Sequence, residues 1–127
     1  MGRYLIDTNV IANFTSEKYS EKAMLFLADV INDVANISVI TKIETLSWRS
    51  AIINEEASVK SFVDYSNVIA LSDIIVNTCI KIRRSKKIKT PDAIIAATAI
   101  VYDFTLLTSD LGFNHIPNLK VLNPFDM

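Results

Sequence analysis

Apolar and polar residues follow one another along this chain in blocks that predict strands and helices in turn. Short apolar runs that stop at a polar cluster predict strands buried on both faces. Longer segments with apolar residues at helical spacing predict amphipathic helices. The predicted strands are residues 3–7, 36–41, 67–71, 104–110 and 118–124. The predicted helices are residues 7–14, 20–36, 41–53, 55–66, 72–87 and 89–100.

Strands that alternate with helices predict an α/β sandwich built on a parallel sheet. We find no internal repeat, low-complexity tract or linker, so residues 1–127 are expected to form one domain. A chain of 127 residues is long enough to bury a substantial core. Half of the residues are hydrophobic and 21% are charged, a composition that excludes an intrinsically disordered chain.

Cysteine content and net charge bear on the cellular compartment of the protein and on whether it could bind nucleic acid. The single cysteine cannot form an internal disulfide, and we find no signal peptide or apolar run of membrane length, so we expect a cytoplasmic protein. The net charge of −1 gives no overall attraction to nucleic acid, so any such contact must depend on a local patch. One segment is strongly basic. It is either such a local patch or the solvated C-terminus of a helix, where cations complement the helix dipole. Its residues are Lys81, Arg83, Arg84, Lys86, Lys87 and Lys89.

The helix predicted from "KTPDAIIAATAI" carries an acid on its apolar face. Thr90 is the expected N-cap and Pro91 the first helical residue. Asp92 then falls on the same face as Ile95 and Ala99, which are expected to be buried. One explanation is the helix dipole, which stabilises an acid in the first turn by about 0.3–1 kcal/mol.

Four acids lie where predicted elements end or begin, and the carboxyl ends of parallel strands meet at one edge of a sheet. They are Asp7, Glu44, Asp92 and Asp110. Each has a local alternative: Asp7 as a helix cap, Glu44 as the partner of Thr41 in a capping box, and Asp110 as the start of a turn before Gly112. Together, four carboxylates at one edge would repel one another unless a cation lay between them.

Magnesium or manganese is the expected cation, because both ions prefer oxygen ligands and Mg²⁺ usually retains several waters. One cysteine and one histidine give no credible zinc site. A metal held by carboxylates can activate water and stabilise the charge that develops on phosphoryl oxygens, which suits phosphodiester hydrolysis.

Four segments together resemble the PIN-domain ribonucleases, in particular the VapC-like toxins of toxin–antitoxin pairs. The segments are "LIDTNV", "TKIETL", "TPDAIIAATAI" and "LLTSD", in that order along essentially the whole chain. The resemblance implies a PIN-like three-layer sandwich in which a mostly parallel sheet of four or five strands is flanked by helices. It also implies an endoribonuclease that uses Mg²⁺ or Mn²⁺, commonly forms a homodimer and is held inactive by a cognate antitoxin.

The resemblance assigns roles to individual positions. It implies that Asp7, Glu44, Asp92 and Asp110 are catalytic, metal-binding acids, and that Thr8, Asn9 and Thr108 support them. The basic segment would then hold RNA phosphates, a contact that gives affinity without reading sequence. The residues expected to make such contacts are Arg83, Arg84, Lys86, Lys87 and Lys89.

One departure from the family pattern concerns the segment after Asp110. Many members carry another acid or histidine three residues on, followed by an aromatic residue, whereas this chain has Phe113 and then Asn114. We therefore expect single-metal chemistry. His115, the only histidine, has no partner evident in the sequence and is expected to be a surface or structural residue.

Two other functions fit parts of the sequence. A phosphatase that forms an aspartyl-phosphate also begins with an Asp after its first strand, but it needs a second aspartate where this chain has Asn9. A non-catalytic PIN-like module that binds RNA or protein is the alternative from a different class. Degenerate modules of that kind usually lose one of the acids, and this chain keeps all four.

Overall fold

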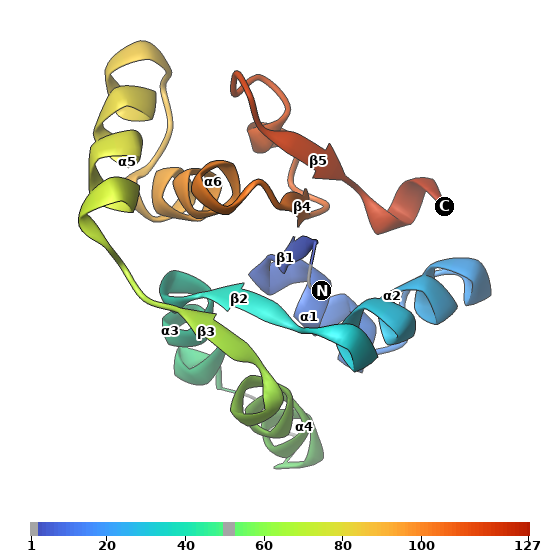
Figure 1. Cartoon of the computed structure of the whole chain (residues 1–127). Coiled ribbons are helices and arrows are strands. Elements are labelled where there is room, and N and C mark those ends of the chain that lie inside the picture. Colours follow the sequence, from blue (N-terminus) through green and yellow to red (C-terminus); the bar gives the residue numbers. More distant parts are fainter. Residues whose placement is uncertain (1–2, 50–52) are drawn as a thin grey trace.

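The computed structural model describes residues 3–49 and 53–127 and has a five-stranded parallel sheet at its centre (Figure 1). The strand order is β3-β2-β1-β4-β5, so β1 lies in the middle between β2 and β4. The predicted α/β fold with a parallel sheet is thereby confirmed. The strands are β1 (Tyr4–Ile6), β2 (Asn36–Ser38), β3 (Asn67–Ile69), β4 (Thr105–Leu107) and β5 (Lys120–Leu122).

Six α-helices and two short 3₁₀ helices connect the strands. The α-helices are α1 (Thr8–Thr15), α2 (Glu21–Asp33), α3 (Val39–Ser47), α4 (Ile53–Tyr65), α5 (Asp73–Ser85) and α6 (Thr90–Tyr102). The 3₁₀ helices are η1 (Leu111–Phe113) and η2 (Pro124–Asp126). No helix in the described ranges is long and apolar enough to cross a membrane.

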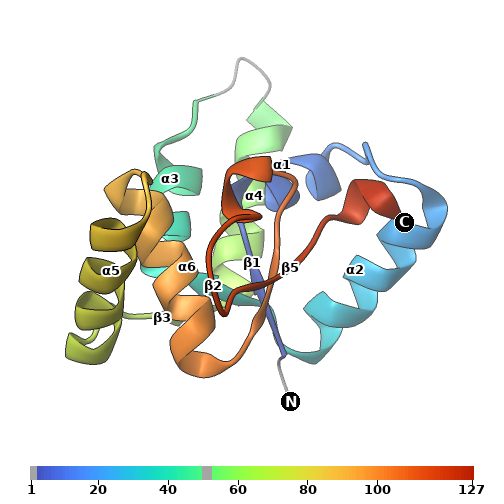
Figure 2. The ribbon, with the colours of Figure 1, turned by 90° about the horizontal axis from the view of Figure 1, so that it is seen from above.

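The sheet separates two apolar cores because successive strand residues point to opposite faces. Leu5 and Leu106, which are paired in register, pack with α5 and α6 on one face. Ile6 and Leu107, the next pair, pack with α1 and α2 on the other. Figure 2 shows α5 and α6 together on one side of the strands, with α2 on the opposite side.

Two predicted helix N-caps, Thr41 and Thr90, were wrong. Ser38 caps α3 by accepting a bond from the amide of Ile40, so residues 39–41 begin a helix instead of extending β2. Thr90 is the first residue of α6. Lys89 occupies the N-cap position before it and makes no capping hydrogen bond with its side chain. Ser72 caps α5, because its hydroxyl accepts a bond from the amide of Ile75. The predicted helix 41–53 is divided between α3 and α4, and residues 50–52 lie outside the described residues.

Candidate active site

The four acids predicted from the sequence come together near the carboxyl ends of β1, β2 and β4. Asp7 directly follows β1, Asp110 follows β4, Glu44 lies on α3 after β2, and Asp92 lies in the first turn of α6. Asp7 is close enough to Glu44 and Asp92 for each to raise its pKa, and Asp92 is affected in the same way by Asp110 and Glu44. The topology therefore brings acids from four separate segments into one electrostatic cluster.

Asp7 is the buried centre of this cluster, with 5% of its surface exposed. Its Oδ1 accepts a 2.8 Å hydrogen bond from the backbone amide of Thr8, so it caps α1 as the alternative interpretation predicted. Its Oδ2 accepts bonds from the Thr108 hydroxyl at 2.8 Å and from the side-chain amide of Asn9 at 3.0 Å. All three predicted supporting residues therefore contact the carboxylate, Asn9 and Thr108 through their side chains and Thr8 through its backbone amide.

Burial raises the pKa of Asp7 from 3.8 to about 6. Hydrogen bonds from the Thr108 hydroxyl and the Thr8 amide oppose this increase, whereas the charges of Glu44 and Asp92 add to it. The groups that favour ionised Asp7 are thus uncharged donors. A buried carboxylate among other carboxylates is stabilised by any cation that enters the cluster.

Glu44 contacts the residue next to Asp7, and it does not cap its own helix. Its Oε1 accepts a 2.7 Å bond from the Thr8 hydroxyl, which links α3 to α1. The predicted capping box with Thr41 is wrong, because α3 begins at Val39 and Thr41 is already inside the helix. Because α3 begins at Val39, Glu44 lies in the second turn of this helix, and there it belongs to the acid cluster.

Asp92 and Asp110 form the other half of the cluster. Partial burial raises the pKa of Asp92, Asp110 and Glu44 raise it further, and Lys89 lowers it. Oδ1 of Asp110 accepts a 2.8 Å bond from the amide of Gly112, which confirms the predicted turn. The same oxygen would lie 3.1 Å from a Cβ atom added at Gly112, so this turn leaves little room for a side chain.

A cavity of about 320 Å³ opens between these two acids and the basic segment. Its wall includes Lys87, Lys89, Asp92, Asp110 and His115. His115 is exposed, as expected of a surface residue, but it faces the same cavity as the acids, which the sequence did not indicate. A cavity with both cations and acids can receive a ligand that carries phosphate and a bound metal.

Phe113 explains the departure from the family pattern. Its side chain is 1% exposed and belongs to the core on the α5–α6 face. An acid at this position would be buried among apolar side chains. In this chain, Phe113 therefore contributes to the packing of the apolar core.

The five basic residues predicted to contact phosphates lie in three different settings. Lys87 and Lys89 line the cavity with Asp92 and Asp110. The side chain of Arg83 donates to the carbonyl of Ile88 at 3.2 Å, so it braces the connection between α5 and α6 and lines a neighbouring hollow. Arg84 and Lys86 line neither hollow. Of the five predicted phosphate contacts, Lys87 and Lys89 are the two that line the same cavity as Asp92 and Asp110.

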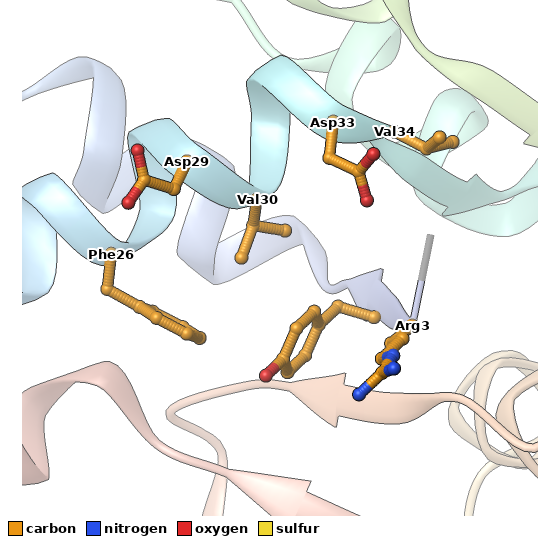
Figure 3. Close-up of a pocket in the computed structure, with 7 residues that line it drawn as sticks. Arg3, Phe26, Asp29, Val30, Asp33 and Val34 are labelled. Atoms are coloured by element: carbon orange, nitrogen blue, oxygen red, sulfur yellow. The ribbon is translucent and has the colours of Figure 1, made fainter. Parts of the chain in front are cut away.

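A second cavity, of about 400 Å³, lies at the opposite edge of the sheet, where β1 and β2 begin. Figure 3 shows Phe26 and Val30 of α2 pointing toward the strand end that carries Arg3, with Asp29 and Asp33 at the rim. It is larger than the cavity beside Asp92, but it contains none of the four clustered acids. Size alone therefore does not identify the active site.

The acids offer the oxygen ligands that Mg²⁺ and Mn²⁺ prefer. Within residues 3–49 and 53–127, however, no three His, Cys, Asp or Glu side chains are grouped tightly enough to form a complete metal-ligand set. Mg²⁺ is commonly held by one or two carboxylates and keeps several waters. The open spacing of Asp7, Glu44, Asp92 and Asp110 fits such a hydrated ion better than one enclosed by protein ligands.

Sequence reasoning missed a second group of polar residues, next to Asp7 in space but distant in the chain. The Ser109 hydroxyl contacts the Tyr19 hydroxyl at 3.1 Å and Oδ1 of Asn123 at 2.9 Å. Only Ser109 lies within a segment singled out above, "LLTSD". Tyr19 and Asn123 carry no local pattern that would have identified them.

Comparison with known proteins supports the resemblance noted above. The family model described as PIN domain matches residues 4–119. No curated protein sequence matches the chain significantly.

Several solved structures share the fold along nearly their whole length. VapBC2 from Rickettsia felis, bound to a DNA fragment from its promoter, is 22% identical with a TM-score of 0.78, covering 94% of this chain and 97% of that chain. DNA-bound VapBC from Salmonella typhimurium is 20% identical with a TM-score of 0.81, covering 98% and 99%. A toxin–antitoxin complex from Klebsiella pneumoniae is 26% identical with a TM-score of 0.73, covering 98% and 99%.

Proposed function

The chain belongs to the PIN domain family, and from this premise we propose that it is a Mg²⁺- or Mn²⁺-dependent endoribonuclease of the cytoplasm. The observation that carries the proposal is the cluster around Asp7. This buried carboxylate has Glu44 and Asp92 as neighbours and forms no ion pair with any residue in the described part of the chain. Such a cluster favours a bound cation.

Asp7, Glu44, Asp92 and Asp110 would hold the ion, which supplies activation of water and compensation of negative charge when it is bound. The chain's own residues orient these acids. Thr108 and Asn9 fix Oδ2 of Asp7, Thr8 holds Glu44, and the Gly112 amide fixes Oδ1 of Asp110. Lys87 and Lys89, on the cavity wall, would hold the phosphates on one side of the scissile bond.

The test is a titration of Mn²⁺ into the metal-free protein, followed by its melting temperature and by cleavage of a mixed RNA substrate. A ligand that binds only the folded state at 100 times its dissociation constant adds about 2.7 kcal/mol of stability. The wild type should melt several degrees higher with Mn²⁺ and should cut RNA. Asp92→Asn should lose both effects while keeping its circular dichroism spectrum. RNA cleavage by Asp92→Asn at the wild-type rate would contradict the proposal.

The alternative function is a PIN-like module that binds RNA or a protein without cutting, and the lack of a complete metal-ligand set among the described residues is compatible with it. The same titration separates the two functions. RNA that binds tightly in the presence of Mn²⁺ but stays intact over long incubation would support the module.

We further propose that the chain is the toxin of a toxin–antitoxin pair. Solved structures of VapBC from two organisms and a toxin–antitoxin complex from a third match it over nearly its whole length, which supports this proposal. The test is co-expression with the product of any small open reading frame adjacent to the gene. A stable complex with reduced RNA cleavage is expected, and full cleavage in the presence of that product would contradict it.

A homodimer is supported by apolar residues that remain exposed on α3 and α5, which both pack against α6. These residues are Ile43 and Leu46 on α3, and Ile74, Val76 and Ile80 on α5. Sedimentation should show a dimer that Ile74→Glu disrupts. Leu25→Glu is the control, because Leu25 is similarly exposed but lies on α2. A monomeric wild type would contradict the dimer.

A further inference from the structure

A chain of hydrogen bonds runs from the C-terminal segment to the acid cluster, through residues far apart in sequence. Tyr19, between α1 and α2, contacts Ser109, the residue between Thr108 and Asp110. Ser109 in turn contacts Asn123, at the start of η2. None of these contacts is made within a single helix or strand.

The direction of each bond follows from the partners available. Ser109 donates its only hydroxyl proton to the carbonyl oxygen Oδ1 of Asn123 at 2.9 Å. Tyr19 must therefore donate to the Ser109 oxygen at 3.1 Å. The oxygen of Tyr19 accepts a 3.2 Å bond from the side-chain amide of Asn13. The relay thus runs from Asn13 through Tyr19 and Ser109 to Asn123, with every hydroxyl donating once.

Asn123 is itself fixed at the receiving end of this relay. Its Oδ1 also accepts a 3.0 Å bond from the amide of Phe125, which caps η2. The ring of Phe125 packs on the ring of Tyr19 with centroids 4.5 Å apart. Tyr19 is buried, so its hydroxyl has little access to water as an alternative partner.

Ser109 is held from its other side by the residues around Asp7. Its backbone amide donates to Oδ1 of Asn9 at 2.9 Å, and the side-chain amide of Asn9 donates to Asp7. The hydroxyl of Thr108 donates to Asp7 and accepts from the amide of Asp110 at 3.1 Å. The position of Ser109 therefore fixes how far Asp110 lies from Asp7.

We propose that Tyr19 and Asn123 are positioning residues, which hold the Thr108–Asp110 turn against Asn9 and so set the distance between Asp7 and Asp110. Neither residue contacts substrate; both act through Ser109. This inference rests on the proposed metal-dependent function, because a fixed distance between two acids matters most where they share a cation. Groups that orient metal ligands commonly change metal affinity by about 10–100-fold when they are removed.

The test uses Tyr19→Phe, which removes the hydroxyl and keeps the ring beside Phe125. Tyr102→Phe is the matched control, because Tyr102 also packs on a phenylalanine ring, that of Phe104, but contacts no site residue in the described chain. The first measurement is amide hydrogen exchange in the metal-free protein by NMR. The amides of Ser109 and Asp110 should exchange faster in Tyr19→Phe, whereas the amides of α6 should exchange as in the wild type.

The second measurement is Mn²⁺ affinity by calorimetry. Tyr19→Phe should bind Mn²⁺ about 10-fold more weakly, Asn123→Ala should behave alike, and Asn123→Asp, which keeps an accepting oxygen, should recover most of the affinity. Wild-type Mn²⁺ affinity in Tyr19→Phe, or unchanged exchange at Ser109 and Asp110, would overturn the inference even if the variant melts lower. A wild type that binds no Mn²⁺ would instead remove the proposed function, and the exchange rates alone would then decide whether the relay holds the turn.

Discussion

The hydroxyl of Thr108 donates a 2.8 Å hydrogen bond to Oδ2 of Asp7, although the two residues are 101 positions apart. The bond exists because β1 and β4 are neighbours in the sheet, with Ile6 paired to Leu107, so the residue after each strand meets the other. The same hydroxyl accepts from the amide of Asp110. Thr108 therefore connects the acid after β1 to the acid after β4.

Thr108→Val should destabilise the metal-free protein by about 1–3 kcal/mol, because it leaves buried partners without their hydrogen bonds. It should also weaken Mn²⁺ binding, since Asp7 loses a donor that favours its ionised form. Chemical unfolding and calorimetry would measure both effects. Thr108→Ser keeps the hydroxyl, so it should lose less stability and less Mn²⁺ affinity. A loss in Thr108→Ser, which keeps the hydroxyl, as large as that in Thr108→Val would contradict this role of the two hydrogen bonds.

The free energy of unfolding of the metal-free protein should increase as the pH falls from 7.5 to 5. The pKa of Asp7 is about 6 in the folded protein and 3.8 in a model compound, so between these values the folded state binds more protons than the unfolded chain. Over the full range of pH the pKa difference corresponds to about 3 kcal/mol for Asp7, of which about 1.4 kcal/mol is gained between pH 7.5 and 5. The raised pKa of Asp92 acts in the same direction.

Urea unfolding at both pH values, with a chelator present, measures this effect. Asp7→Asn cannot titrate at this position, so its stability should change much less between pH 7.5 and 5. A wild-type protein that becomes less stable over this range would contradict the burial and charge argument.

Gly112→Ala should disturb Asp110 without unfolding the protein. The new methyl carbon would lie 3.1 Å from Oδ1 of Asp110, closer than ordinary contact, so the carboxylate must shift. We expect Mn²⁺ affinity to fall by about 10-fold with a small change in melting temperature. Leu111→Ala, an exposed change in the same turn, is the control and should bind Mn²⁺ as the wild type does.

Thr41→Val and Thr45→Val should change stability in opposite directions, although both residues are buried on α3. The Thr41 hydroxyl is buried without a hydrogen-bond partner in the described chain, so its removal should stabilise the protein by about 1 kcal/mol. The Thr45 hydroxyl donates to the carbonyl of Thr41 at 2.7 Å, so its removal should cost about 1 kcal/mol. Urea unfolding of the two variants would show whether the signs differ.

Lys87→Gln should weaken RNA binding and should also make that binding less dependent on salt. If Lys87 contacts a phosphate of single-stranded RNA, the slope of log affinity against log salt should decrease by about 0.7. Binding measured with a chelator keeps the RNA intact. Lys22→Gln, an exposed change on α2 far along the chain from the cavity, should leave the slope unchanged.

The sequence by itself determined the order of the helices and strands, and it identified the four acids that lie at the ends of these elements. Apolar runs and helical spacing are local patterns, and the polar residues that end β1 and β4 are read directly from "LIDTN" and "LLTSD". Parallel strands align their carboxyl ends, so the convergence of Asp7 and Asp110 followed from the fold class. These inferences needed only short-range periodicity and one rule about sheets.

The tertiary structure alone decided which polar groups meet. A local pattern favoured Thr41 as the cap of α3 and partner of Glu44. In the structure Ser38 is the cap, the helix begins at Val39, and Glu44 contacts Thr8. Tyr19 reaches Ser109 across 90 positions. Such contacts depend on which strands are neighbours and on how helices pack over them, and no spacing within a short segment encodes that arrangement.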